Sequence, residues 1–259
     1  MNPLKHLIIG TRFEPYARRL YGALTNTNQL YITEADLRDA RDNAFVRAMM
    51  RKTLKRDSAC VDIGAHRGFF LEQFFEFAPD GRHYAFEPIP AMFSDLSRRF
   101  PRAEVFDCAL SDHNGEAGFQ FVPELPGWSG LRPHPYPFRV HPQEILVKLK
   151  KLDDVIPLDV HVAFIKIDVE GAELEVLRGS TEILRRCRPI VYFECAKIHH
   201  AHYGTTPEVV HQLLAECGLG VFLLDETPLS MQAFAADYEA SYRSGYDRTA
   251  WQNYFSMPI

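Results

Sequence analysis

The sequence has little that would place the protein in a membrane or outside the cell. No apolar run reaches the ~18 residues that a membrane-spanning helix needs, and the apolar patch at residues 7–9 is too short for the core of a signal peptide. The five cysteines stand singly, without a Cys-x-x-Cys pair, which is typical of buried thiols in a reducing compartment. We therefore expect a cytoplasmic protein with no membrane partner.

An excess of positive charge is also absent. The formal net charge is -5, so no overall basic field would attract the phosphate backbone of a nucleic acid. The Gly-x-Gly-x-x-Gly spacing of dinucleotide-binding turns is missing as well, which weakens the hypothesis of an NAD-dependent oxidoreductase without removing it. We expect no nucleic-acid partner.

The composition of the chain suits one large domain with an appendage. Its 259 residues are 46% hydrophobic, enough to bury a full core. Residues 1–57 lack strand alternation, and residues 46–54 place apolar side chains at helical spacing. This pattern predicts an N-terminal helical appendage, residues 1–57, packed on a domain formed by residues 58–259.

From Cys60 onward, short apolar strands alternate with helical patterns. This alternation predicts a doubly wound, mostly parallel α/β sheet with helices on both faces. The predicted strands of this sheet occupy residues 60–63, 83–86, 103–107, 161–168, 190–194, 221–224 and 253–257. Two more, at 118–122 and 144–149, flank a segment rich in proline, glycine and aromatic residues, 123–142. Because loops of this length in compact domains are usually functional or disordered, we interpret this aromatic-rich one as a substrate-facing flap.

The most informative stretch is VDIGAHRGFF, residues 61–70, in which a buried strand runs into two glycines and then a helix. Strand, glycine turn and helix together indicate a site for a nucleotide-like ligand. Asp62, ahead of the glycines, would repel a pyrophosphate but attract a cation. Glu87 ends the next strand, where a carboxylate can accept hydrogen bonds from ribose hydroxyls. S-Adenosylmethionine, with its ribose, sulfonium and amino group, matches both requirements.

Five segments resemble the FkbM-type S-adenosylmethionine-dependent methyltransferases. In chain order they read VDIGAHRGFF, AFEPIPAMF, DCALSDHNGE, KLDDVI and FIKIDVEGAELEVLRG, and they span roughly residues 60–194. FIKIDVEGAE is the most specific of them, since a glycine turn alone is a weak signal. The resemblance implies a class I methyltransferase, Rossmann-like fold of seven strands with the last one antiparallel. It also implies methyl transfer to hydroxyl oxygens of sugars or secondary metabolites.

The resemblance assigns the cofactor to residues of the turn and of the following strand ends. The implied cofactor-binding residues are Asp62, Gly64, Ala65, His66, Gly68, Phe69, Glu87, Pro88, Asp107, Cys108, Ala109, Leu110 and Asp168. The glycine turn would line the methionine half, Glu87 would bind the ribose, and residues 107–110 would border the adenine. His66 stands where the family usually has asparagine, so its role stays open.

Candidate catalytic residues follow the fourth and fifth strands. A hydroxyl acceptor must lose its proton, which calls for a general base or a metal. The candidates are Lys166, Asp168, Glu194 and His199. Lys166 lies in an apolar strand where an unpaired ammonium would be costly, so we expect a carboxylate partner and name Glu194. Asp168 and Glu194 could also hold Mg²⁺, although two carboxylates are a weak signal and the metal ligands stay unassigned.

These features predict an S-adenosylmethionine-dependent O-methyltransferase whose partner is a small hydroxylated acceptor. A non-catalytic protein that keeps the fold and binds the cofactor is the alternative. Nucleic-acid methylation is disfavoured because IDVEGAE, rather than a DPPY-like or NPPY-like motif, follows the fourth strand. The sequence identifies neither the acceptor nor the oligomeric state.

Overall fold

The computed structural model describes residues 34–133, 136, 139–200, 202–243 and 252–259. The chain divides into two compact units, Met1–Arg41 and Asp42–Ile259. Helix α2 (Glu34–Thr53) begins in the first unit and continues into the second. The predicted appendage falls mostly on residues 1–33, which lie outside the described residues, so its boundary at residue 57 stays a prediction.

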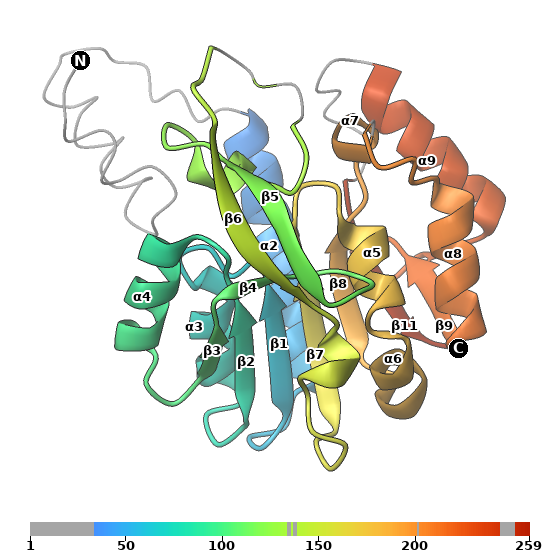
Figure 1. Cartoon of the computed structure of the whole chain (residues 1–259). Coiled ribbons are helices and arrows are strands. Elements are labelled where there is room, and N and C mark those ends of the chain that lie inside the picture. The colour runs from blue at the N-terminus through green and yellow to red at the C-terminus, as the bar shows by residue number, and fades with distance from the viewer. Residues whose placement is uncertain (1–33, 134–135, 137–138, 201, 244–251) are drawn as a thin grey trace, which may run out of the picture. The chain divides into compact units, whose positions relative to one another are not determined.

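An eight-stranded sheet forms the centre of the second unit (Figure 1). Its strands are β1 (Ala59–Ile63), β2 (His83–Phe86), β3 (Glu104–Phe106), β7 (Val162–Ile167), β8 (Ile190–Glu194), β9 (Leu219–Phe222), β10 (Pro228–Leu229) and β11 (Asn253–Pro258). The order is β10-β9-β11-β8-β7-β1-β2-β3. Strands β3, β2, β1, β7 and β8 pair in parallel, whereas β11 is antiparallel to both neighbours. The predicted doubly wound sheet with an antiparallel last strand is confirmed, and the two-residue β10 adds an edge to the seven strands expected.

Helices on both faces explain why the central strands are apolar throughout rather than alternating. Strands β1 and β2 are buried at every position. The helices are α3 (Phe69–Phe77), α4 (Pro90–Arg99), α5 (Glu173–Arg178), α6 (Thr181–Cys187), α7 (Lys197–His200), α8 (Pro207–Glu216) and α9 (Met231–Arg243). Alternate residues of β1 enter two different apolar clusters, Val61 and Ile63 one and Cys60 the other. Met49 and Met50 of α2 join the second cluster, as their helical spacing predicted.

A second, three-stranded sheet has the order β4-β6-β5. It consists of β4 (Cys108–Leu110), β5 (Gly115–Phe121) and β6 (Gln143–Lys150). The predicted third strand of the main sheet, residues 103–107, ends at Phe106, because Cys108–Leu110 turns away to pair with β6. The short helices η2 (Pro126–Trp128) and η3 (Leu152–Asp154) follow β5 and β6. Apolar contacts of Ile89 with Phe119, Val147 and Leu149 fix this sheet beside the end of β2.

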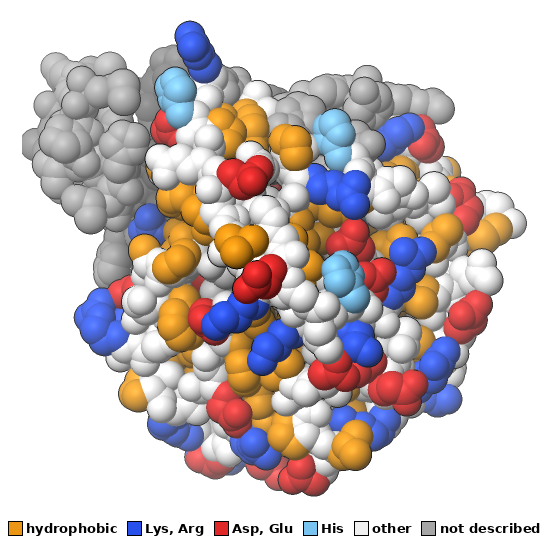
Figure 2. Space-filling view, viewed as in Figure 1, with side chains coloured by type: hydrophobic (Ala, Val, Ile, Leu, Met, Phe, Trp, Pro, Cys, Tyr) orange, Lys and Arg blue, Asp and Glu red, His pale blue; other side chains and the backbone are white. Residues whose placement is uncertain are grey.

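In the described ranges, no helix combines the length and the apolar character needed to cross a membrane. Lys and Arg side chains are interspersed with Asp and Glu over the face seen in Figure 2. Among the described residues, that face therefore shows no large patch of one charge sign.

Candidate functional site

A cavity lies at the carboxyl ends of β1, β2 and β7, the edge at which open α/β sheets bind their ligands. The space between its lining residues, including the part open to solvent, is about 570 Å³. Eight of the predicted cofactor residues line it: Gly64, His66, Glu87, Pro88, Cys108, Ala109, Leu110 and Asp168. Strand β4 therefore brings residues 108–110 to the cavity, although it does so from the second sheet.

The turn after β1 requires glycine at two positions. Gly64 has φ +71°, and a Cβ on it would lie 2.1 Å from the carbonyl oxygen of Asp168. Gly68 has φ +77°, and a Cβ there would lie 2.6 Å from the ring of Phe100. Glycine alone adopts such φ values at little cost. These two glycines let the turn pass close to the end of β7 and start α3.

Glu87 is a buried carboxylate in the cavity wall. One of its oxygens accepts the backbone N–H of His66 at 2.7 Å, and the other accepts that of Ile89 at 2.9 Å. Burial raises the pKa of Glu87 to about 7, although both N–H donors act in the opposite direction. The side chain is thus fixed in one orientation, with its remaining lone pairs available to a polyol.

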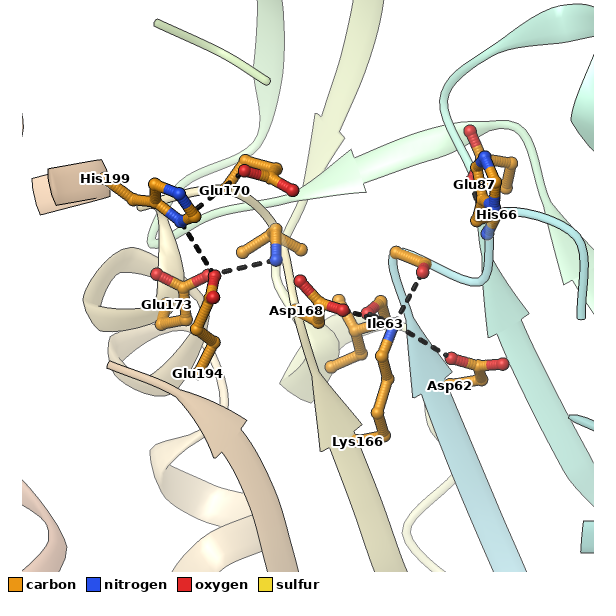
Figure 3. Close-up of polar contacts among 12 residues, drawn as sticks. Asp62, Ile63, His66, Glu87, Lys166, Asp168, Glu170, Glu173, Glu194 and His199 are labelled. Carbon is orange, nitrogen blue, oxygen red and sulfur yellow. Dashed lines mark hydrogen bonds and ion pairs between the residues drawn. The ribbon is translucent and has the colours of Figure 1, made fainter. Parts of the chain in front are cut away.

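The ammonium of Lys166 lies beneath the glycine turn rather than in the cavity (Figure 3). It is 3.4 Å from Asp62 and donates hydrogen bonds to the carbonyl oxygens of Ile63 and Gly64 at 3.1 and 2.6 Å. Burial lowers the pKa of Lys166, but the carboxylates of Asp62, Asp168 and Glu87 together outweigh it and raise that pKa, so the ammonium stays charged.

The predicted pairing of Lys166 with Glu194 is wrong. Register explains the difference, because Lys166 on β7 stands beside Asp62 on β1 and Tyr192 on β8. Glu194 lies two residues further along β8 and instead contacts His199. Both members of the Asp62–Lys166 pair are buried. The position of this buried pair therefore favours a role in holding the turn.

Five predicted cofactor residues do not line the cavity. Asp62 is buried under the turn, Ala65 is buried within it, and Gly68 precedes the first residue of α3. The Phe69 side chain is 43% exposed. Asp107 carries an exposed carboxylate that binds the ammonium of Lys148 at 2.7 Å, because the strand switch after Phe106 turns it outward. Direct cofactor contacts by these residues stay a prediction.

A second group of polar side chains, which we name the Glu–His cluster, consists of Glu170, Glu194 and His199 (Figure 3). His199 Nδ1 is 2.9 Å from Glu194 and 3.5 Å from Glu170, and one donor atom from each residue lies within 4.8 Å of the others. Burial would lower the pKa of His199, but the two carboxylates overcome it and raise that pKa to about 10. Two carboxylates and one imidazole could also serve a divalent transition metal.

The structure brings together the predicted catalytic residues Glu194 and His199, and it adds Glu170. A glutamate at this place, just ahead of α5, would ordinarily act as a favourable charge at the N-terminus of the helix. It has φ +59°, and this left-handed conformation turns it away from α5 toward His199. The sequence signal for this conformation is the glycine directly after Glu170, since Gly171 also has positive φ. Glu170 additionally lines the cavity next to Asp168.

Glu173 fixes the loop that carries Glu170. One of its oxygens accepts the N–H groups of Val169 and Gly171 at 3.0 and 3.3 Å, and the other is 3.2 Å from His200 Nε2. Both side chains of this Glu173–His200 pair are 2% exposed. Their burial and the number of these contacts indicate a rigid support behind the Glu–His cluster.

Part of the predicted flap folds over the cavity. Pro126, Gly127, Ser129 and Leu131 line it. The ring of Trp128 is 6.2 Å from that of His199, in an edge-to-face arrangement. Residues 134–135 and 137–138 of the flap lie outside the described residues. The flap thus links the cavity to the Glu–His cluster, and its contact with a substrate stays a prediction.

The strand order, the antiparallel β11 and the glycine turn next to an acidic strand end define a class I methyltransferase-like α/β fold. Residues 62–219 match the family described as the Methyltransferase FkbM domain. The chain belongs to this family, as the sequence motifs indicated.

Among curated relatives, Methyltransferase 1 of Beauveria bassiana is 32% identical over 145 residues, which cover 48% of this chain and 58% of that protein. The 2-O-methyltransferase NoeI of Sinorhizobium fredii is 29% identical over 157 residues, covering 54% of this chain and 64% of the relative. The chain thus spans about three-fifths of the length of the curated relatives it matches. A crystal structure of an FkbM methyltransferase from Methylobacillus flagellatus superposes with a TM-score of 0.46 at 18% identity, covering 79% of this chain and 44% of that one.

Proposed function

We propose that this protein transfers a methyl group from S-adenosylmethionine to a hydroxyl group of a small molecule, with a sugar or a glycosylated metabolite as the acceptor. One observation carries the proposal. The Gly64 turn, Glu87, Asp168 and Glu170 line one cavity, which supports a nucleoside site and a set of proton-handling groups at the same edge of the sheet. Membership of the FkbM family supports methyl transfer, and the 2-O-methyltransferase relative supports an oxygen acceptor.

The residues of the cavity fit this cofactor. Glu87 offers carboxylate oxygens to the two ribose hydroxyls, and Ile89, Leu110 and Phe119 offer an apolar wall to a purine. Asp168 places negative charge in the same cavity, which favours a positively charged ligand over a pyrophosphate. When bound, the cofactor supplies a methyl group on a sulfonium, and the protein has to align an acceptor oxygen with it.

Asp168 is the proposed proton acceptor. Its carboxylate follows β7, lines the cavity and is 46% exposed. Partial removal from water raises its pKa to about 6, while Lys166 at 3.8 Å acts in the opposite direction. Asp168 is therefore mostly ionised at neutral pH and close enough to its working pKa to accept a proton.

His199 is not suited to act as the base in this arrangement, because a pKa of about 10 keeps it protonated. As a cation held by Glu194 and Glu170, it can instead donate a hydrogen bond that orients the acceptor oxygen. Lys166 supports the site from below by holding the turn and Asp168. A divalent metal in the Glu–His cluster is the alternative way to activate the acceptor.

Calorimetry with S-adenosylmethionine and S-adenosylhomocysteine tests cofactor binding, and absence of binding at high micromolar concentration would refute the proposal. Glu87→Ala should weaken binding at least ~10-fold, since hydrogen bonds to a charged group contribute about 1.5–3 kcal/mol. Glu104→Ala is the matched control, because Glu104 on β3 is an exposed glutamate bound to Arg82 away from the cavity.

Transfer itself is tested with methyl-labelled S-adenosylmethionine over a panel of sugars and glycosylated metabolites. Label on an acceptor oxygen is the expected result, and label on nitrogen would contradict the O-methyl assignment. A protein that binds the cofactor but transfers no label to the panel or to a cell extract would match the non-catalytic alternative instead. Where wild type transfers the label, Asp168→Asn should leave binding of S-adenosylhomocysteine, whose sulfur is uncharged, within a few-fold of wild type while reducing turnover by about 10²–10⁴.

A further inference from the structure

His66 lines the cavity and carries a buried hydrogen-bonding atom that the described part of the chain does not use. The residue lies in the turn between Gly64 and Gly68, and its side chain is part of the cavity lining. Its Nε2 is buried and has no hydrogen-bond partner within the part of the chain that the structure describes. Buried polar atoms are nearly always paired in folded proteins, so an unpaired one in a cavity wall points to a partner supplied by a ligand.

The position of His66 indicates which part of a ligand it would meet. Its backbone N–H binds Glu87 at 2.7 Å, so the imidazole and the proposed ribose carboxylate start from the same point of the turn (Figure 3). The flap also approaches the ring, since a Cβ added to Gly127 would lie 3.9 Å from Nε2. The imidazole therefore lies close to the flap, on a residue whose backbone holds Glu87.

The chemistry of the ring complements that of Glu87. Ionised Glu87 can only accept hydrogen bonds, whereas a neutral imidazole has one donor and one acceptor nitrogen. Burial, Arg67 and Lys166 lower the pKa of His66 to about 4, so the ring is neutral at physiological pH. A neutral ring beside the cavity also avoids repelling a cationic sulfonium. A hydroxyl, which both donates and accepts, suits this pair of side chains.

We propose that His66 Nε2 hydrogen-bonds to one ribose hydroxyl of the cofactor, so that His66 and Glu87 together form a ribose clamp. This inference rests on the proposed function, because it takes S-adenosylmethionine as the ligand. His66 stands where the family turn usually has asparagine. The proposal gives this residue a defined role in nucleoside selectivity.

Backbone conformation guides the choice of variants. His66 has φ +48°, a value that glycine and asparagine tolerate best. His66→Gly removes the imidazole without adding strain, and His66→Asn keeps a polar side chain of shorter reach. His161→Gly, at an exposed histidine outside the cavity lining, is the control. Thermal unfolding of each variant establishes that it is folded before binding is compared.

The experiment measures calorimetric affinities of wild type and variants for S-adenosylhomocysteine and for its 2′-deoxy and 3′-deoxy analogues. We expect His66→Gly to bind S-adenosylhomocysteine about 3–10-fold more weakly than wild type does. For the analogue that lacks the contacted hydroxyl, wild type and His66→Gly should bind equally, because two changes that remove the same contact are not additive. The affinity of His66→Asn for S-adenosylhomocysteine should fall between those of wild type and His66→Gly, and that of His161→Gly should match wild type.

Two results would overturn the ribose clamp. In the first, His66→Gly binds S-adenosylhomocysteine as tightly as wild type does. If methyl transfer by that variant is nevertheless slower, His66 would be assigned to the acceptor instead. The other is an equal loss for all three ligands, which would indicate a general change in the turn. If wild type binds none of the ligands, the proposed function fails first and the clamp fails with it.

Discussion

Lys166 Nζ donates a hydrogen bond of 2.6 Å to the carbonyl oxygen of Gly64. A side chain of β7 thereby holds the first glycine of the turn that follows β1, and Asp62 on β1 balances its charge. The strand that carries the proposed base and the turn that would carry the cofactor are thus coupled by one buried ammonium. The first prediction concerns the removal of that ammonium.

Lys166→Met should destabilise the protein by about 3–5 kcal/mol, because it leaves the carboxylate of Asp62 buried without its counter-ion. Chemical denaturation measures this loss. The double variant Lys166→Met with Asp62→Leu should recover most of it, since no charge then remains buried. Lys148→Met, which breaks the exposed pair with Asp107, should change stability little. Equal losses in the two single lysine variants would show that the buried pair does not stabilise the turn.

Gly64→Ala should abolish measurable cofactor binding or folding, because the new Cβ would lie 2.1 Å from the carbonyl oxygen of Asp168. Gly204→Ala separates this clash from the cost of the backbone conformation, since Gly204 also has positive φ, +63°, but no atom within 4 Å of its Cβ position. The control should lose about 1–2 kcal/mol of stability. A Gly64→Ala variant as stable as the control, with unchanged affinity for S-adenosylhomocysteine, would contradict the close approach of the turn to β7.

Affinity for S-adenosylhomocysteine should fall as the pH is lowered from 8 to 6. Glu87 has a pKa of about 7, and only its charged form accepts hydrogen bonds from both ribose hydroxyls. The charged groups that act on it are Lys166, which favours ionisation, and Asp62, which opposes it. Glu87→Gln should remove the Glu87-dependent part, a change of up to about 10-fold across this range. An unchanged pH profile in the variant would rule out Glu87 as the titrating group.

In the ligand-free protein, the effect of Glu87 on stability should decrease with rising pH, whereas its effect on cofactor affinity increases. Because the folded state holds this proton more tightly than the unfolded chain, the contribution of Glu87 to stability declines as the pH rises from about 4.5 to about 7. The difference in unfolding free energy between wild type and Glu87→Gln across this range isolates the effect. A difference that does not vary with pH would mean that the folded protein leaves the pKa of Glu87 unshifted.

Methyl transfer should survive treatment with a metal chelator. In the Glu–His cluster, the proton on His199 already provides positive charge between Glu170 and Glu194. The measurement is turnover after dialysis against EDTA, with native mass spectrometry to detect bound metal. Loss of turnover that Mn²⁺ restores in wild type, but not in Glu170→Gln, would contradict this expectation and identify the cluster as a metal site.

Local sequence patterns were sufficient to predict the parallel sheet, the glycine turn and Glu87. Buried strands such as ACVDI and HYAF are apolar at nearly every position, and the glycines mark where β1 ends. These signals lie within a few neighbouring residues. Gly64, His66, Glu87 and Asp168, which the sequence and its family resemblance predict as cofactor-binding residues, all line the cavity.

Local sequence patterns did not predict which charged residues pair with one another. Lys166 was assigned to Glu194, but strand register places it beside Asp62, and register depends on how distant segments pack. The same holds for the departure of Cys108–Leu110 to a second sheet, which needs β6 as its partner some forty residues later.

The sequence by itself determined the class of fold and the glycine turn, because glycine spacing, apolar strands and an acidic strand end are properties of contiguous residues. Only the tertiary structure decided that Glu170 joins Glu194 and His199, that Lys166 supports the turn, and that His66 lines the cavity with its Nε2 buried and without a partner in the described chain. The physical reason is that charge pairing and burial are set by groups far apart in the chain, which meet when the strands reach one edge of the sheet.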